Sequence, residues 1–162
     1  MTKSQLYGKK ILIVDDEPDV LDTLEELLFM CPVVRAGTFE EAKQLLEQDV
    51  FDLVILDIMG VNGYELLDLV KRKKVPAVML TANALSVKDT VKSFKQGAAF
   101  YVPKEEMGNI VTYLSDILEA QNKGKSLMDR WLERMDSYYE KRFGKDWKED
   151  DPEFWKKFPF LY

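Results

Sequence analysis

Five short apolar runs, rich in Val, Ile and Leu, alternate with segments of helical periodicity in the first 121 residues. The runs are nearly continuous rather than alternating with polar residues, which is typical of strands buried on both faces. We expect strands at residues 10–14, 32–36, 53–56, 77–80 and 98–102. The expected helices cover residues 20–30, 39–48, 64–74, 87–96 and 110–120.

Five repeats of a strand followed by a helix predict right-handed crossovers. The fold class is therefore α/β, a doubly wound five-stranded parallel sheet with helices on both faces. Thr38 and Glu41 form the pattern of a capping box at the start of the second helix. In open sheets of this kind, ligands bind beyond the carboxyl ends of the strands.

The chain contains no histidine, and its only cysteine is Cys31. Without histidine, Ser-His-Asp and Cys-His catalysis, most zinc and haem sites, and a phosphohistidine donor are excluded. A single cysteine cannot form an intramolecular disulfide. The chemistry must rest on carboxylates, Lys, hydroxyls and a hard cation held by oxygen.

Charged residues make up 32% of the 162 residues and hydrophobic residues 46%. No apolar run approaches the ~20 residues of a membrane span, and residues 1–10 lack the apolar stretch of a signal peptide. We therefore expect a cytoplasmic protein. Neither part of the chain is basic enough to indicate nucleic-acid binding.

Polar side chains follow four of the predicted strands. They are Asp15, Asp16 and Glu17 after the first, Asp57 after the third, Thr81 after the fourth and Lys104 after the fifth. Any one of them could be an ordinary surface or capping residue, but together they predict a site at one edge of the sheet. Converging carboxylates require a cation, and oxygen ligands favour Mg²⁺.

Four segments carry a resemblance to the receiver domain of two-component response regulators, which covers residues 9–121. They are ILIVDDEP from Ile11, DLVILDIM from Asp52, VMLTA from Val78 and QGAAFYVPK from Gln96. Each is weak alone, whereas their order and spacing make a strong signal. The resemblance implies the flavodoxin-like strand order 2-1-3-4-5.

The resemblance also implies roles for individual residues. Asp57 would accept the phosphoryl group, and Thr81 and Lys104 would contact its oxygens. Asp15, Asp16, Asp57 and the backbone carbonyl of Met59 would hold Mg²⁺. Thr81 and Tyr101 would be the switch pair that responds to phosphorylation. The implied partners are a sensor histidine kinase or a histidine phosphotransfer protein, and a downstream protein target.

Two departures from the receiver pattern stand beside Asp57 and Lys104. The segment between Asp57 and Gly63 is about two residues shorter than usual and lacks its customary proline. Glu105 follows Lys104 where the family usually has proline. We expect a reshaped loop at the third metal ligand and an extra carboxylate near the phosphate site.

Residues 122–162 differ in composition from residues 1–121 and are expected to form a separate helical extension. They hold ten aromatic residues, including all three tryptophans. From Leu127 the apolar positions predict an amphipathic helix of about 18 residues, starting near Ser126 and ending at Gly144. Asp151 and Pro152 predict the start of a second short helix, which carries the aromatic residues Phe154, Trp155, Phe158, Phe160 and Tyr162.

Three arrangements of this extension remain open. It could fold back on its own receiver, form a homodimer or dock on a partner through the receiver face or the tail, or lie on a membrane surface. Burial of large aromatic side chains is favourable, which argues against a solvated tail.

The predicted function is a phosphorylation-controlled signalling module that is not an enzyme beyond its own phosphorylation and dephosphorylation. One alternative is a phosphohydrolase of the haloacid-dehalogenase type, although Met59 occupies the position of that family's second Asp. The other is a degenerate receiver that binds partners without being phosphorylated. The cognate kinase, input signal and downstream target do not follow from the sequence.

Overall fold

The computed structural model describes residues 5–82, 86–123 and 127–161. Strands and helices alternate as predicted up to the fifth strand, and two 3₁₀ helices (η1 and η2) were not foreseen. In chain order the elements are β1 (Ile11–Val14), α2 (Pro18–Leu27), β2 (Val33–Ala36), α3 (Phe39–Gln48), β3 (Leu53–Asp57), α4 (Gly63–Arg72), β4 (Ala77–Thr81), α5 (Val87–Lys95), β5 (Phe100–Pro103), η1 (Lys104–Asn109), α6 (Ile110–Lys123), α7 (Leu127–Phe143), η2 (Trp147–Asp150) and α8 (Pro152–Leu161).

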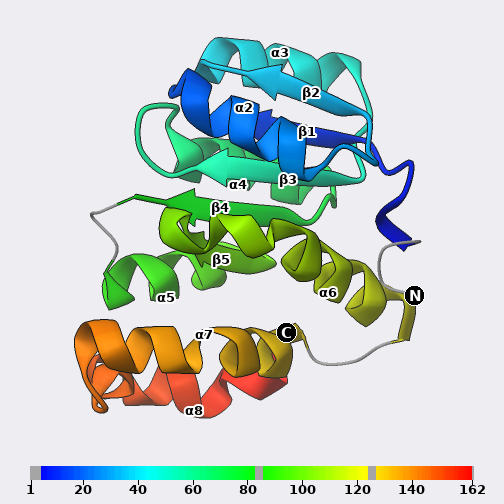
Figure 1. Cartoon of the computed structure of the whole chain (residues 1–162). Coiled ribbons are helices and arrows are strands. Elements are labelled where there is room, and N and C mark those ends of the chain that lie inside the picture. The colour runs from blue at the N-terminus through cyan, green and yellow to red at the C-terminus, as the bar shows by residue number, and fades with distance from the viewer. Residues whose placement is uncertain (1–4, 83–85, 124–126, 162) are drawn as a thin grey trace.

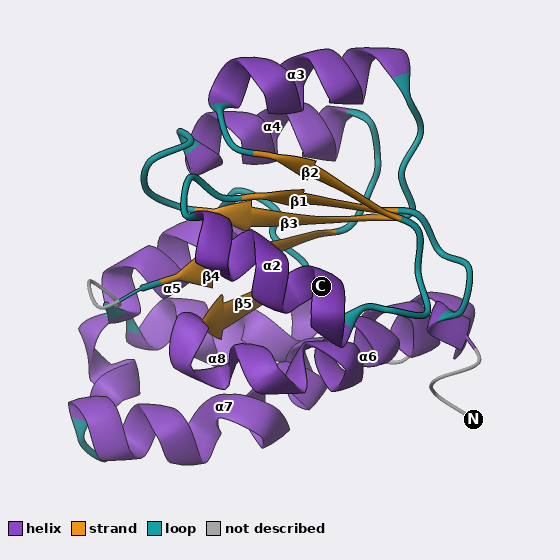
Figure 2. Cartoon of the chain, turned by 45° about the horizontal axis from the view of Figure 1, so that its top comes forward, coloured by secondary structure: helices purple, strands orange, loops and turns teal. Residues whose placement is uncertain are grey.

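The five strands form one parallel sheet in the order β2-β1-β3-β4-β5. This confirms the predicted doubly wound fold and strand order. Helices α2 and α6 cover one face of the sheet, and α3, α4 and α5 cover the other (Figures 1 and 2). Every residue of β1, β3, β4 and β5 is buried, as the continuous apolar runs predicted. Strand β2 lies at an edge and is only partly buried.

Two helix starts follow the capping patterns in the sequence. The Thr38 hydroxyl accepts a hydrogen bond of 3.1 Å from the Glu41 backbone N–H at the start of α3. The Asp151 carboxylate accepts one of 3.2 Å from the Phe154 N–H at the start of α8. Both residues satisfy an N–H group that lacks a partner within its own helix.

The C-terminal extension packs on the chain's own receiver, so the first of the three arrangements is the one observed. Helix α7 is 17 residues long and lies beside α6, and η2 contacts α5 (Figure 1). Trp131 and Tyr139 of α7 are completely buried, and Trp147 and Trp155 are nearly so. The extension thereby adds a helical layer next to β5, the last strand of the sheet.

Polar contacts fix α7 to the receiver as well. The Trp131 indole N–H donates a 2.8 Å hydrogen bond to the backbone carbonyl of Tyr101 in β5. The hydroxyls of Tyr139 and Thr90 are 2.6 Å apart in a buried hydrogen bond between α7 and α5. Strand β5 is an edge strand, whose outward backbone groups need partners, and α7 supplies one.

A buried carboxylate joins α6 to α7. Asp116 is 2% exposed, and its oxygens lie 2.9 Å from the Arg130 guanidinium and 3.0 Å from that of Arg134. We did not foresee this cluster, although an acidic residue on the apolar face of a predicted helix was the available signal. Two arginines four residues apart on α7 match it.

The expected division between residues 121 and 122 falls within α6, which continues to Lys123. The predicted breaker Gly124, the helix start at Ser126 and the aromatic Tyr162 lie outside the described residues, as do the side chains of Phe158 and Phe160. Within the described ranges, the helices are too short or too polar to cross a bilayer.

Candidate functional site

The predicted site residues meet at the carboxyl edge of the sheet. Asp57 is the last residue of β3, and Thr81 is the last residue of β4. Asp15 directly follows β1, and Lys104 directly follows β5 as the first residue of η1. Parallel strands end at the same edge, so residues far apart in the sequence come together there.

Lys104 lies at the centre of this group. Its ammonium nitrogen is 3.0 Å from Asp15 Oδ2, 3.3 Å from Asp57 Oδ1 and 3.1 Å from Glu17 Oε1. Asp15 is completely buried and Asp57 is 4% exposed, whereas Glu17 lies at the surface. One ammonium thus faces three carboxylates. We did not anticipate the contact between Lys104 and Glu17.

The segment after β1 holds its carboxylates close together. The Glu17 backbone N–H donates a 2.9 Å hydrogen bond to Asp15 Oδ1. Asp15, Asp16 and Glu17 each offer an oxygen atom, and these atoms lie within 4.8 Å of one another. Asp16 is exposed at the mouth of the site, where a hydrated cation has access.

Burial changes the protonation of these groups. It raises the pKa of Asp57 from 3.8 to about 7, repulsion by Asp15 adds to the effect, and Lys104 opposes it. Burial also raises the pKa of Asp15, against the hydrogen bond from Glu17 and the attraction of Lys104. Burial lowers the pKa of Lys104, but its carboxylate partners outweigh this and raise the pKa above the usual value. The carboxylates carry more negative charge than Lys104 can neutralise.

The shortened loop after Asp57 depends on glycine. Gly60 has a φ of +83°, and a β-carbon there would overlap the Asp16 carboxylate. Asn62 adopts the left-handed conformation, with a φ of 56°, immediately before α4. The Met59 side chain is 69% exposed, so it does not fill the site.

A hollow of about 200 Å³ opens above the carboxylates. Its lining residues are Asp16, Glu17, Asp57, Met59, Gly60, Thr81, Ala82 and Lys104. The hollow is small and has charged groups beside apolar atoms in its lining, with room for a tetrahedral anion and a cation but not for an extended organic substrate.

Comparison with known proteins agrees with this geometry. The family model of the response regulator receiver domain matches residues 11–115. The chain belongs to the response regulator receiver family. Receiver domains are signalling modules rather than classical enzymes. They bind Mg²⁺ at an acidic pocket and interact with histidine kinases or phosphotransfer proteins.

Individual relatives match about three fifths of this chain. The chain is 38% identical over 104 residues to the two-component response regulator ORR24 of Oryza sativa subsp. indica, covering 60% of this chain and 16% of that protein. It is 34% identical over 113 residues to the two-component response regulator ARR18 of Arabidopsis thaliana, covering 64% and 18%. The chain therefore spans less than a fifth of the length of these relatives.

Solved receivers have the same fold. A CheY-like response regulator receiver domain protein from Methanospirillum hungatei superposes with a TM-score of 0.65 at 29% identity, covering 72% of this chain and 98% of that one. The response regulator DrrB of Thermotoga maritima gives a TM-score of 0.62 at 28% identity, covering 70% and 54%.

Tyr101, the expected aromatic partner of Thr81 in this receiver, is completely buried. Its hydroxyl makes no hydrogen bond of normal geometry to any residue that the structure describes. Burial raises the pKa of Tyr101, while the nearby hydroxyls of Thr81 and Thr90 lower it. Tyr101 therefore lies inward, near Thr81 and near Thr90, whose hydroxyl contacts Tyr139 of α7.

Glu105 does not place its carboxylate at the phosphate site, so our expectation was wrong. Glu105 Oε1 instead accepts a 2.6 Å hydrogen bond from the Tyr138 hydroxyl of α7. The residue that replaces the family's proline is thus directed to the C-terminal extension. The sequence offered no signal for this pairing, because the two residues are 33 positions apart.

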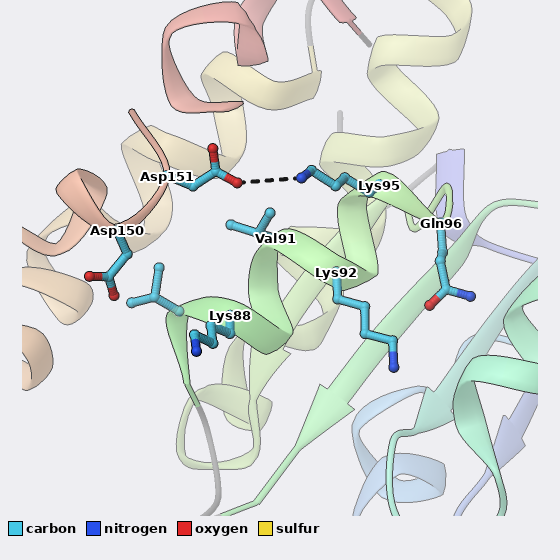
Figure 3. A pocket seen from close by; sticks show the side chains of 8 residues that line it. Lys88, Val91, Lys92, Lys95, Gln96, Asp150 and Asp151 are labelled. Atoms are coloured by element: carbon cyan, nitrogen blue, oxygen red, sulfur yellow. Dashed lines mark hydrogen bonds and ion pairs between the residues drawn. The ribbon is translucent and has the colours of Figure 1, made fainter. Parts of the chain in front are cut away.

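A second hollow, of about 460 Å³, lies away from the carboxylates, between α5 and the extension (Figure 3). Val91 lies between the two sides, and the Lys95 side chain points toward Asp151. The Lys92 side chain points away from both aspartates, and its ammonium lies 4.0 Å from the centroid of the Tyr64 ring. The ammonium of Lys95 is 3.4 Å from Asp151 Oδ2. The lining of this hollow carries both positive and negative side chains, so the hollow does not favour a ligand of one charge.

Proposed function

We propose that this receiver accepts a phosphoryl group on Asp57 from the phosphohistidine of a sensor kinase or phosphotransfer protein. The proposal rests above all on one observation, the meeting of buried Asp57 with the Lys104 ammonium at 3.3 Å beside a small hollow. The chain has no histidine of its own, so the donor must be another molecule. The proposal includes a cytoplasmic location, where ATP is available to charge such a kinase.

In this reaction an Asp57 carboxylate oxygen bonds to phosphorus as the bond between phosphorus and the donor nitrogen breaks. The donor ring carries a proton on its other nitrogen before transfer, so the products are an acyl phosphate on Asp57 and a neutral imidazole on the partner. Lys104 acts as a point charge toward the phosphoryl oxygens, and the Thr81 hydroxyl is their second contact. Phosphoryl transfer needs this alignment and charge compensation more than covalent help.

Mg²⁺ fits the residues that are present. Asp15 Oδ2 is buried, and among the described residues its only polar contact is the ion pair with Lys104. Asp15, Asp16 and Asp57, with the Met59 backbone carbonyl, are the proposed ligands. When bound, the ion neutralises charge on these carboxylates and on the phosphoryl oxygens.

We also propose that Thr81 and Tyr101 form the switch through which phosphorylation changes protein contacts. Movement of Thr81 toward a phosphoryl group would free space beside its side chain, and buried Tyr101 is the adjacent aromatic residue. The downstream target is a protein whose affinity differs between the two states.

Both alternatives fit less well. A haloacid-dehalogenase-type hydrolase needs an acid/base carboxylate two residues after the nucleophile, where this chain has Met59 with an exposed side chain. A degenerate receiver would not need Lys104 paired with Asp57. We therefore propose that the chain catalyses only its own phosphorylation and dephosphorylation.

The test is incubation of the purified protein with acetyl phosphate and Mg²⁺, followed by intact mass measurement. We expect the mass to rise by one phosphoryl group, and Asp57→Asn to abolish the gain. Asp68→Asn, at an exposed position on α4, is the matched control and should react normally. A full gain in Asp57→Asn would place the acceptor elsewhere and contradict the proposal.

A further inference from the structure

The segment that carries Lys104 is hydrogen-bonded to α7 on both sides of the lysine. Trp131 donates to the Tyr101 carbonyl over 2.8 Å, and Tyr138 donates to Glu105 over 2.6 Å. Lys104 lies between these two bonded positions. Helix α7 therefore contacts the chain on each side of Lys104, through the Tyr101 backbone and the Glu105 side chain.

Helix α7 is itself firmly positioned. The Trp131 ring contacts Phe94 edge-on at a centroid distance of 5.1 Å and stacks on Trp155 at 5.8 Å. The Tyr139 hydroxyl is bonded to Thr90 of α5. Helix α7 thus cannot shift along β5 without breaking buried contacts to both α5 and α8.

The hydrogen bond from Tyr138 also fixes the position of the Glu105 carboxylate. Glu105 follows Lys104 directly, and Lys104 already faces Asp15, Glu17 and Asp57 within 3.3 Å. A fourth carboxylate near this ammonium would compete with Asp57 and the phosphoryl oxygens for it, and would repel an incoming phosphodonor. Tyr138 holds that carboxylate on the side of α7. Burial and the bond to Glu105 raise the pKa of Tyr138 to about 12, so the hydroxyl keeps its proton at neutral pH.

We infer that Tyr138 is a positioning residue for phosphorylation, which acts by keeping Glu105 away from Lys104. This inference rests on the proposed function, because it concerns the rate at which Asp57 is phosphorylated. It gives the extension a part in the reaction, although none of the extension's described residues lines the hollow above Asp57.

The test compares the rate of Asp57 phosphorylation by acetyl phosphate and Mg²⁺ in the full-length wild type, Tyr138→Phe and the double variant Tyr138→Phe/Glu105→Gln. We expect Tyr138→Phe to react about three- to tenfold more slowly, as for an added like charge near the site. The double variant should regain the wild-type rate, because the freed side chain is then uncharged. Tyr7→Phe, which alters a tyrosine that is 74% exposed, is the matched control and should react as the wild type does.

A wild-type rate in the double variant would show that the Glu105 charge slows the reaction. If Tyr138→Phe instead acted by loosening α7, Glu105→Gln would not restore the rate. A Tyr138→Phe variant that reacts at the wild-type rate, or one that stays slow in the double variant, would overturn the inference and leave the proposed function intact. Failure of the wild type to become phosphorylated would instead overturn the proposed function, and this inference with it.

Discussion

Gly63 packs so closely against Asp57 that a β-carbon on Gly63 would overlap the Asp57 backbone carbonyl oxygen. The Gly63 N–H also donates a 3.1 Å hydrogen bond to the Ile58 carbonyl. The first residue of α4 therefore lies directly against the backbone of the proposed phosphoryl acceptor. The short loop between them closes only because that residue has no side chain.

Gly63→Ala should destabilise the protein by about 1–3 kcal/mol, because the added methyl group must displace backbone rather than a flexible side chain. Urea unfolding measures this change. Gly108→Ala is the control, since a β-carbon at Gly108 meets nothing within 4 Å, and its stability should change by less than about 0.5 kcal/mol. Equal effects of the two substitutions would show that the close approach of α4 to Asp57 is not a constraint.

Mg²⁺ should raise the melting temperature of the wild type, since an ion that binds only the folded state stabilises it by mass action. Asp16→Ala should remove most of that rise, because it deletes one of the proposed ligands. Asp19→Ala removes an exposed carboxylate of α2 that does not belong to the group of Asp15, Asp16 and Glu17, and it should leave the response unchanged. A full Mg²⁺ response in Asp16→Ala would move the metal to other ligands.

The stability of the Mg²⁺-free protein should depend on Asp57 and on pH. The folded-state pKa of Asp57, about 7, lies above its ordinary value of 3.8. The folded state therefore loses stability, relative to the unfolded chain, as the pH rises through this range. Asp57→Asn abolishes this penalty. With a chelator present, it should raise the melting temperature at about pH 8 by roughly 2–4 °C for each kcal/mol gained.

The gain from Asp57→Asn should shrink as the pH falls and nearly vanish below the ordinary value of 3.8, where the carboxyl is mostly protonated in both states of the wild type. Thermal melts across this pH range measure the difference between the two proteins. Asp68→Asn, at an exposed carboxylate, should show no such trend. A gain that stays constant with pH would contradict the raised pKa.

Trp131→Ala should cost about 3–5 kcal/mol, the usual range for emptying the site of a buried aromatic side chain. Phe29→Ala removes an aromatic ring that is 82% exposed, and it should change stability by less than about 0.5 kcal/mol.

Deletion of residues 125–162 should lower the melting temperature and expose apolar surface beside β5. A deletion that changes neither the melting temperature nor the mass by light scattering would show that the extension does not stabilise the receiver.

Much of the receiver was predictable because its signals are local. Continuous apolar runs identified the five strands, and α3 has the bounds that its Thr38 cap predicted. The ends of β3 and β4 lie one residue beyond the expected ones, at Asp57 and Thr81, because polar residues can extend a strand when its neighbours pair with them. The meeting of Asp15, Asp57 and Lys104 followed from strand topology.

The features that the sequence left open depend on contacts between distant residues. The direction of the Glu105 carboxylate is decided by Tyr138, and the apolar stripe of α7 did not reveal which surface covers it. The pairing of Asp116 with Arg130 and Arg134 likewise needs two helices in their final places. Local periodicity does not carry such information.

The covering of β5 by α7 has a consequence for the order of events during synthesis. Trp131 follows Tyr101 by 30 residues, which at roughly 5–20 residues per second is a delay of about 2–6 s. In that interval the edge of the sheet has no cover, and chaperones or another nascent chain can reach it. Slow translation of the last helices would therefore show as aggregation of newly made chains, while the finished molecule would be as stable as before.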